Sequence, residues 1–255
     1  MTSKSPAPSP STRVLVWDLP TRLLHWTLAG SFASAFVVAS VADEHSPSFV
    51  VHMLLGAIAA IAVVLRVAWG FVGSRYARFR SFAFGPGSVV SYLRGVFRGE
   101  GERHRGHNPA NAWAAFAMFA LLLGVAATGA LIARGGHVVK DVHAVLVYAM
   151  VAVVAAHLAG LALQAIRRRE NVAIDMVDGK QVGDPAHAIA SAHPVAAVAA
   201  IGLLVASAAV LVRGYDPATR RLTLPGVGPS LELGNAEEGD RDRRGGRGRD
   251  RHHDD

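Results

Sequence analysis

Five long apolar runs limit what this chain can fold into. They cover about residues 23–42, 49–72, 111–133, 142–166 and 194–212. Each is close to the roughly 20 residues that an α-helix needs to cross a bilayer. Because lipid offers no partners to exposed backbone N–H and C=O groups, such runs are expected to be helical. The sequence therefore predicts an all-α integral membrane protein with lipid around it.

The composition supports this class and narrows the possible cofactors. Hydrophobic residues make up 51% of the 255-residue chain and charged residues only 18%, a balance typical of membrane proteins. The chain has no cysteine, which excludes disulfides, iron–sulfur clusters, covalently attached haem and thiolate zinc sites. A bound metal would need His, Met, Tyr or carboxylate ligands. The first apolar run is too long for a signal peptide, so we expect a retained helix.

Arginines between the runs predict the orientation of the chain in the membrane. The second connection carries Arg75, Arg78, Arg80, Arg94, Arg98, Arg103 and Arg105, and Arg167 to Arg169 follow the fourth run. The positive-inside rule puts both segments and the N-terminus in the cytoplasm. The charged C-terminal tail is then periplasmic if the fifth run is a true span, and cytoplasmic otherwise. Nucleic-acid binding fits an arginine-rich segment between two spans poorly, and no such partner is expected.

Four histidines lie within spans or at their first turns: His25, His52, His143 and His157. With alternating spans, His25 and His157 fall at the inner depth and His52 and His143 at the outer depth. His143 and His157 are fourteen residues apart, about 21 Å along a helix and within about 40° of the same face. His104, His107, His187 and His193 lie in cytoplasmic connections, and we assign them no role.

Two depth-matched histidine pairs are typical of bis-His iron. Without cysteine, a non-covalent b-type haem at each depth is the natural candidate. A zinc site would gather its ligands at one depth rather than split them. A proton pathway remains an alternative, because intramembrane histidines also mark ion routes.

Two arginines are candidate partners for haem propionates. Arg66 follows His52 by fourteen residues and shares its face, and Arg22 lies near His25. Either guanidinium could pair with a propionate. Snorkelling toward the cytoplasmic membrane surface explains both arginines equally well.

Several segments together resemble one family. They are "DLPTRLLHW", "HMLLGAIAAIAVVLRVAWGFVGSRYARF", "GHNPANAW", "VHAVLVYAMVAVVAAHLAGL" and "RRRENVAIDMVDGK". In order and spacing they resemble the bacterial cytochrome b561 and nickel–iron hydrogenase b-type cytochrome family over residues 13–182. The resemblance implies a four-helix transmembrane bundle with two b haems, ligated by His25 with His157 and by His52 with His143.

The resemblance over residues 13–182, together with the composition of the flanking segments, predicts the domain organisation. We expect a disordered arm at residues 1–12, a dihaem membrane domain at 13–182, a linker and fifth transmembrane helix at 183–213, and a low-complexity charged tail at 214–255.

The leading functional hypothesis is electron transfer across the inner membrane, in respiratory electron transport. The family implies a quinone as redox substrate, together with a partner redox protein such as a soluble or periplasmic cytochrome or a hydrogenase-like subunit. One alternative is a superoxide:quinone oxidoreductase, for which Arg134 and Lys140 are the available steering charges. A more remote alternative is a histidine-dependent membrane transporter or sensor. Whether the chain is itself an oxidoreductase or a subunit of one stays open.

Overall fold

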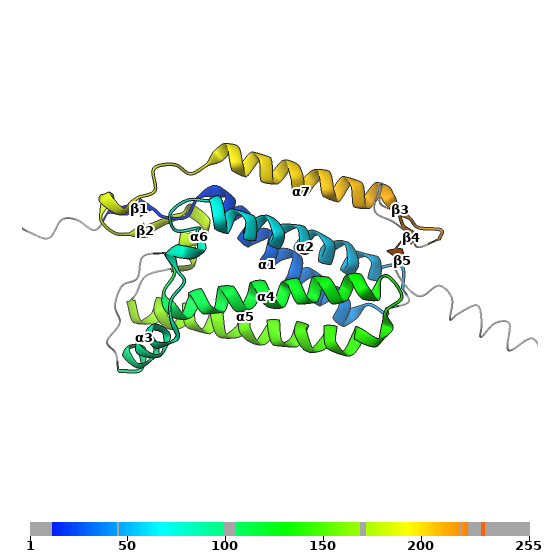
Figure 1. Cartoon of the computed structure of the whole chain (residues 1–255), viewed down its shortest axis with the longest axis horizontal. Coiled ribbons are helices and arrows are strands. Elements are labelled where there is room, and N and C mark those ends of the chain that lie inside the picture. The colour runs from blue at the N-terminus through cyan, green and yellow to red at the C-terminus, as the bar shows by residue number, and fades with distance from the viewer. Residues whose placement is uncertain are drawn as a thin grey trace, which may run out of the picture. The chain divides into compact units, whose positions relative to one another are not determined.

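The computed structural model describes residues 12–44, 46–98, 106–168, 172–219, 221–223 and 231–232. The α-helices of these residues are α1 (Leu19–Val41), α2 (Phe49–Val72), α3 (Pro86–Arg98), α4 (Pro109–Ile132), α5 (Lys140–Arg168), α6 (Asp175–Asp178) and α7 (Pro194–Gly214) (Figure 1). Short 3-10 turns are η1 (Phe79–Ser81), η2 (His137–Val139), η3 (Val172–Ile174) and η4 (Pro185–His187). The strands are β1 (Arg13–Leu15), β2 (Lys180–Val182), β3 (Tyr215–Asp216), β4 (Arg221–Leu222) and β5 (Leu231–Glu232).

Parts of the predicted organisation lie outside the described residues. These are nearly all of the N-terminal arm, the stretch 99–105 with Arg103 and Arg105, Arg169, and the charged tail from residue 233.

Within the described residues, five helices are long and apolar enough to cross a membrane: α1, α2, α4, α5 and α7. They coincide with the five predicted runs, so the prediction of an all-α membrane protein with a fifth C-terminal helix is confirmed. The ends differ because polar residues extend two of the helices. Helix α1 begins at Leu19, since Asp18 caps its first turn, and α5 begins at Lys140 and continues into its terminal arginines.

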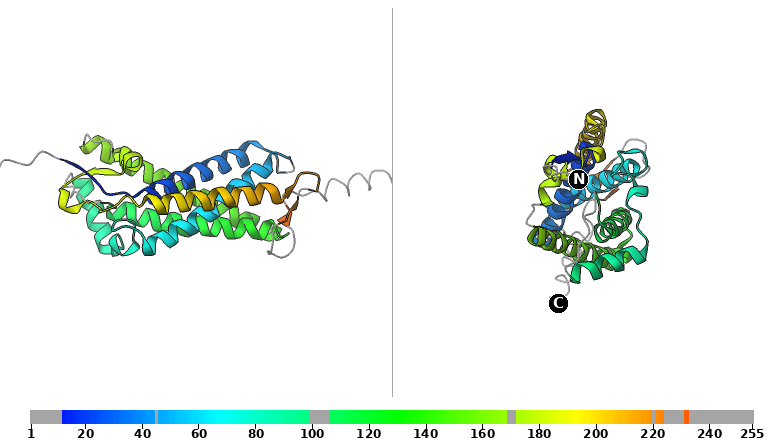
Figure 2. Two further views of the ribbon diagram at one scale, coloured as in Figure 1. Left: turned by 90° about the horizontal axis from the view of Figure 1, so that it is seen from above. Right: turned by 90° about the vertical axis from the view of Figure 1, so that its left-hand side faces the viewer.

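Helix α3 was not predicted. It occupies part of the arginine-rich connection and packs against the end of α5 (Figures 1 and 2). The Gln164 amide donates to the Tyr92 hydroxyl at 2.8 Å, and the Arg167 guanidinium donates to the Val96 carbonyl. Apolar and basic residues alternate in α3 with helical spacing, so it is amphipathic and too polar to span a bilayer.

The chain forms two compact units. The first comprises Met1–Trp26, Val64–Ala120 and Ala149–Ala200. In it, β1 pairs antiparallel with β2, with Arg13 opposite Val182 and Leu15 opposite Lys180. Arg13 also forms ion pairs with Asp175, at 2.9 Å, and with Asp178 in α6. These contacts hold the segment after α5 beside the segment before α1.

The second unit comprises Thr27–Val63, Leu121–Tyr148 and Ile201–Asp255. In it, the sheet β3-β4-β5 follows the carboxyl end of α7 (Figure 2). Leu222 of β4 packs with Leu211 of α7 and Val50 of α2 in a buried cluster. The described start of the predicted tail is therefore folded against helices of this unit.

Asp18 joins the ends of two helices within the first unit. Its side chain is fully buried and accepts the Thr21 backbone N–H at 2.8 Å, which caps α1. It also accepts the Trp69 indole N–H at 3.1 Å and the Ser74 backbone N–H at 3.3 Å. One carboxylate thus fixes the start of α1 to the end of α2.

Replacing Asp18 should destabilise the protein. Asp18→Ala leaves three buried donors without an acceptor, so we expect a loss of about 2–3 kcal/mol in unfolding free energy. Denaturant titration in detergent, followed by circular dichroism, measures this loss. Asp18→Asn keeps one acceptor oxygen for the helix cap and should lose about half as much. Equal stability of Asp18→Ala and the unmodified protein would contradict the role given to this carboxylate.

Candidate functional site

His52 of α2 and His143 of α5 lie together in the second unit. Their ring centroids are 6.4 Å apart and the ring planes make an angle of 81°. Two metal–imidazole bonds of about 2 Å, with about 1.1 Å from nitrogen to ring centre on each side, give about 6 Å between centroids. The observed separation therefore suits two rings that ligate one metal ion from opposite sides.

Hydrogen bonds determine which nitrogen each ring of this pair presents. His52 Nδ1 lies 2.9 Å from the Ala35 carbonyl oxygen, which can only accept. Nδ1 therefore carries the proton, and Nε2 keeps a free lone pair. His143 Nδ1 lies 2.9 Å from the Thr128 hydroxyl. A histidine that ligates a metal commonly donates its other ring N–H to a nearby oxygen in this way.

The pair fits iron ligation better than a cage of several metal ligands. The described residues contain no group of three or more His, Cys, Asp or Glu side chains able to hold a metal ion. A haem needs only two axial ligands from the protein, because the porphyrin supplies the other four. The neighbouring Gly129 leaves room at the ring edge, since a Cβ there would lie 3.5 Å from His143 Cε1.

His25 of α1 and His157 of α5 lie in the first unit with Arg66 of α2. The two rings interact electrostatically with one another, and His25 also with Arg66. His157 Nδ1 is buried without a hydrogen-bond partner among the described residues. A buried, unpartnered ring nitrogen is costly unless a ligand engages the ring, so this region also fits a haem.

Arg66 is buried, with 4% of its surface exposed. Its guanidinium lies 3.4 Å from the Ala77 carbonyl oxygen and 5.4 Å from the centre of the Phe119 ring. Among the described residues, no carboxylate lies within ion-pair distance of this guanidinium, although Asp18 attracts it from further away. A buried cation with such weak partners can accept an anionic group such as a propionate.

Arg22 has a different environment. Its guanidinium donates to the Val177 carbonyl, and Gly179 lies against it, since a Cβ there would be 3.3 Å from Arg22 Cζ. This contact ties α1 to the segment that follows α5. The structure thus gives Arg22 a backbone partner, and its role toward a propionate stays a prediction.

His107 is a residue that the sequence reasoning passed over as part of a connection. Its ring lies tilted by 30° against Phe82, with ring centroids 4.2 Å apart, and meets the edge of Trp17 with centroids 4.8 Å apart. Burial, together with the nearby charges of Arg66, His157 and His25, lowers the pKa of His107 to about 3. Its Nδ1 also has no partner among the described residues. The only sequence signal was its place in "GHNPANAW", just before α4.

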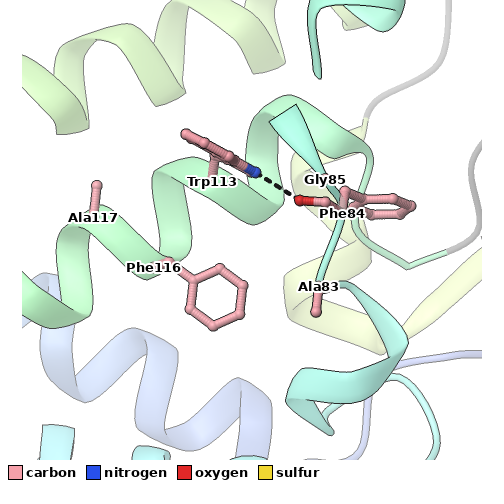
Figure 3. A pocket seen from close by; sticks show the side chains of 6 residues that line it. All are labelled: Ala83, Phe84, Gly85, Trp113, Phe116 and Ala117. Carbon is pink, nitrogen blue, oxygen red and sulfur yellow. Dashed lines mark hydrogen bonds between the residues drawn. The ribbon is translucent and has the colours of Figure 1, made fainter. Parts of the chain in front are cut away.

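An apolar hollow of about 580 Å³ lies in the same unit (Figure 3). Its lining comes from the segment before α3 and from the first turns of α4, and consists of Ala83, Phe84, Gly85, Trp113, Phe116 and Ala117. The Trp113 indole N–H donates to the Phe84 carbonyl at 2.9 Å across it. The ring centroids of Phe116 and Phe82 are 5.2 Å apart. Because Phe82 also contacts His107, a row of neighbouring rings leads from the hollow to His107.

The two charges considered for superoxide steering are not equivalent. The Lys140 ammonium forms an exposed ion pair with Glu44 at 3.0 Å. This pairing reduces the positive field that Lys140 can offer an anion. Arg134 lies exposed in the turn between α4 and α5.

Comparison with known proteins identifies one family. The family model described as prokaryotic cytochrome b561 matches residues 16–179. A curated protein of Rhizobium leguminosarum bv. viciae, "Probable Ni/Fe-hydrogenase B-type cytochrome subunit", is 31% identical over 139 residues. The match covers 46% of this chain and 58% of that relative, so the chain spans little more than half of the relative's length. No solved structure matches the chain.

The lowered pKa of His107 predicts a pH dependence of stability. The unfolded chain binds a proton at this ring below about pH 6.5, whereas the folded chain does so only near pH 3. The contribution of the neutral ring to the free energy of unfolding is therefore fully present above about pH 6.5. It decreases as the solution is acidified, by about 2 kcal/mol at pH 5. His107→Gln cannot titrate and should show a shallower loss between pH 7 and pH 5 in the same unfolding measurement. Parallel pH profiles of the two proteins would contradict the buried neutral state.

Proposed function

Because the chain belongs to the prokaryotic cytochrome b561 family, we propose that it carries two b-type haems and transfers electrons between a quinone and a redox partner. The family assigns it as a b-type cytochrome, and its five apolar helices make it a multi-pass membrane protein. The number of haems, the ligands and the redox substrates belong to the proposal.

The observation that carries the proposal is the geometry of His52 and His143. Their 6.4 Å separation suits two axial ligands, and both Nδ1 atoms already face oxygen atoms. This leaves each Nε2 available to iron. We assign this pair to one haem, near the outer membrane face.

The second haem is assigned to His25 and His157. Arg66 would hold one propionate, since its buried guanidinium lies 3.4 Å from the Ala77 carbonyl oxygen and beside the Phe119 ring but pairs with no carboxylate among the described residues. Arg22 is the weaker candidate, because the Val177 carbonyl already engages it. The arginines of the second connection support a cytoplasmic location for this end.

A bound haem supplies one-electron redox chemistry, and the chain sets its surroundings. His52 and His143 would hold one haem, and His25 and His157 the other. With two histidine ligands for each iron, the chain would favour electron transfer over the binding of oxygen. The apolar helices exclude water and anchor each ring, which favours electron transfer over ligand chemistry.

The quinone is assigned to the apolar hollow near α3. It is lined by the aromatic rings of Phe84, Trp113 and Phe116, which suit a flat apolar ring. Phe82 and Phe116 connect it to His107, beside the region of His25 and His157. This arrangement supports electron exchange between a quinone and the inner haem.

The redox partner is proposed from the relative. That protein is named as a probable subunit of a Ni/Fe-hydrogenase, so a hydrogenase-like subunit is the first candidate for this chain, ahead of a soluble or periplasmic cytochrome. Superoxide is a less favoured substrate, because Lys140 is already paired with Glu44.

Removing one ligand should remove one haem. We expect His157→Leu to lose the inner haem and keep the outer one, so haem per chain falls from about two to one. His143→Leu should do the reverse. Haem extraction and reduced-minus-oxidised spectra of the purified proteins measure both. His187→Leu, outside the spans, is the control. Retention of both haems in His157→Leu would contradict the assignment, and absence of any haem from the unmodified protein would reject the cytochrome function.

A quinol should reduce the protein through the hollow. Stopped-flow mixing with a short-chain ubiquinol should produce haem reduction, and Trp113→Leu should raise the quinol concentration for half-maximal rate several-fold, because it removes apolar contact area. Leu203→Ala, at an exposed apolar position of α7 outside the hollow, is the control. Reduction by superoxide but not by quinol would favour the alternative substrate.

A further inference from the structure

Thr128 of α4 lies beside His143 with a defined hydrogen-bond arrangement. Its hydroxyl oxygen is 2.8 Å from the Gly124 carbonyl and 3.1 Å from the Val125 carbonyl. Both carbonyls can only accept, so the hydroxyl proton points to its own helix, as is common for threonine within helices. The hydroxyl lone pairs then face the ring of His143, 2.9 Å from Nδ1.

This arrangement fixes the protonation of the ring. A hydroxyl has one proton, and here the backbone of α4 takes it. Thr128 can therefore only accept from His143, which puts the ring proton on Nδ1. Nε2 is left as the nitrogen with a free lone pair.

We propose that Thr128 is a positioning residue for the outer haem, which holds His143 in the tautomer and orientation that present Nε2 to the iron. The inference rests on the proposed haem ligation by His52 and His143 and adds a residue to it. The hydrogen bond also makes the ring a stronger electron donor, because partial loss of the Nδ1 proton raises the basicity of Nε2.

The two rings of this pair are held by different means. His52 donates to the Ala35 backbone carbonyl, which no substitution removes. His143 relies on a side-chain hydroxyl. The outer haem can therefore be tuned through residue 128 without touching an iron ligand.

The test compares Thr128→Val with Thr128→Ser in the full-length, haem-loaded protein. Valine keeps the shape and removes the acceptor, whereas serine keeps the hydroxyl. In Thr128→Val we expect the outer haem to bind at least about tenfold more weakly in the ferric state. If the ferrous state is unaffected, this raises the midpoint potential by about 59 mV. The inner haem of the same molecule is the internal control and should keep its potential.

A second readout follows the ring orientation. The angle between the two axial rings shapes the low-spin ferric electron paramagnetic resonance signal, so Thr128→Val should change the outer-haem signal and Thr128→Ser should restore it. An outer haem with unchanged potential and signal in Thr128→Val would overturn the inference. So would a serine variant that behaves like valine, because the methyl group would then be the part that matters.

Other outcomes separate this inference from the proposed function. If the unmodified protein binds no outer haem, the ligand assignment fails and the role of Thr128 with it. If Thr128→Val does not accumulate, Thr128→Ala against Thr128→Ser makes the same comparison. An alanine variant with an unchanged outer haem overturns the inference, and a raised potential supports it.

Discussion

A polar ring within a membrane-spanning helix must find its own partner, because lipid supplies none. In the second unit this constraint is met within the protein: His52 donates to the Ala35 carbonyl and His143 to the Thr128 hydroxyl. In the first unit it is met only in part, since His157 Nδ1 in α5 has no partner among the described residues. Both rings of the pair in the second unit thus have a hydrogen-bond partner, whereas the first unit contains a buried ring nitrogen without one.

The first unit holds its polar residues by a few long-range contacts. Asp18 connects the start of α1, which carries His25, to the end of α2, which carries Arg66. The pairing of β1 with β2 and the ion pairs of Arg13 bring the segment after α5 to the same place. Apart from Trp69, the residues that make these contacts lie outside the apolar runs. The hydrogen bonds of Asp18 are sheltered from water because the carboxylate is fully buried, whereas the Arg13 ion pairs are partly exposed. The positions of His25 and Arg66 therefore depend on residues that no hydropathy pattern selects.

The sequence was sufficient for the spans. It also singled out four histidines within the spans or at their first turns, whose role as ligands stays a prediction. Long apolar runs form transmembrane helices in a bilayer, and histidines are rare within such helices. It was not sufficient for α3, because an amphipathic helix among arginines resembles an ordinary basic connection. His107 and Thr128 were also missed. Each matters through a neighbour that is distant in sequence or on another helix, and single-residue patterns do not report such neighbours. The role of the fully buried Asp18 could not be predicted for the same reason, because its partner Trp69 is 51 residues away in the sequence.

The connection between α4 and α5 has a consequence for how the protein is made. It is short, and Gly135 adopts a positive φ of 88° in its turn. Thr128 and His143 are therefore only 15 residues apart, and Ala35 and His52 only 17. At a synthesis rate of about 5–20 residues per second, each histidine follows its oxygen partner out of the ribosome within about one to three seconds. The hairpin of α1 and α2 and the hairpin of α4 and α5 can therefore each form the hydrogen bond of their own histidine before they pack together. Haem would then bind imidazoles that are already oriented.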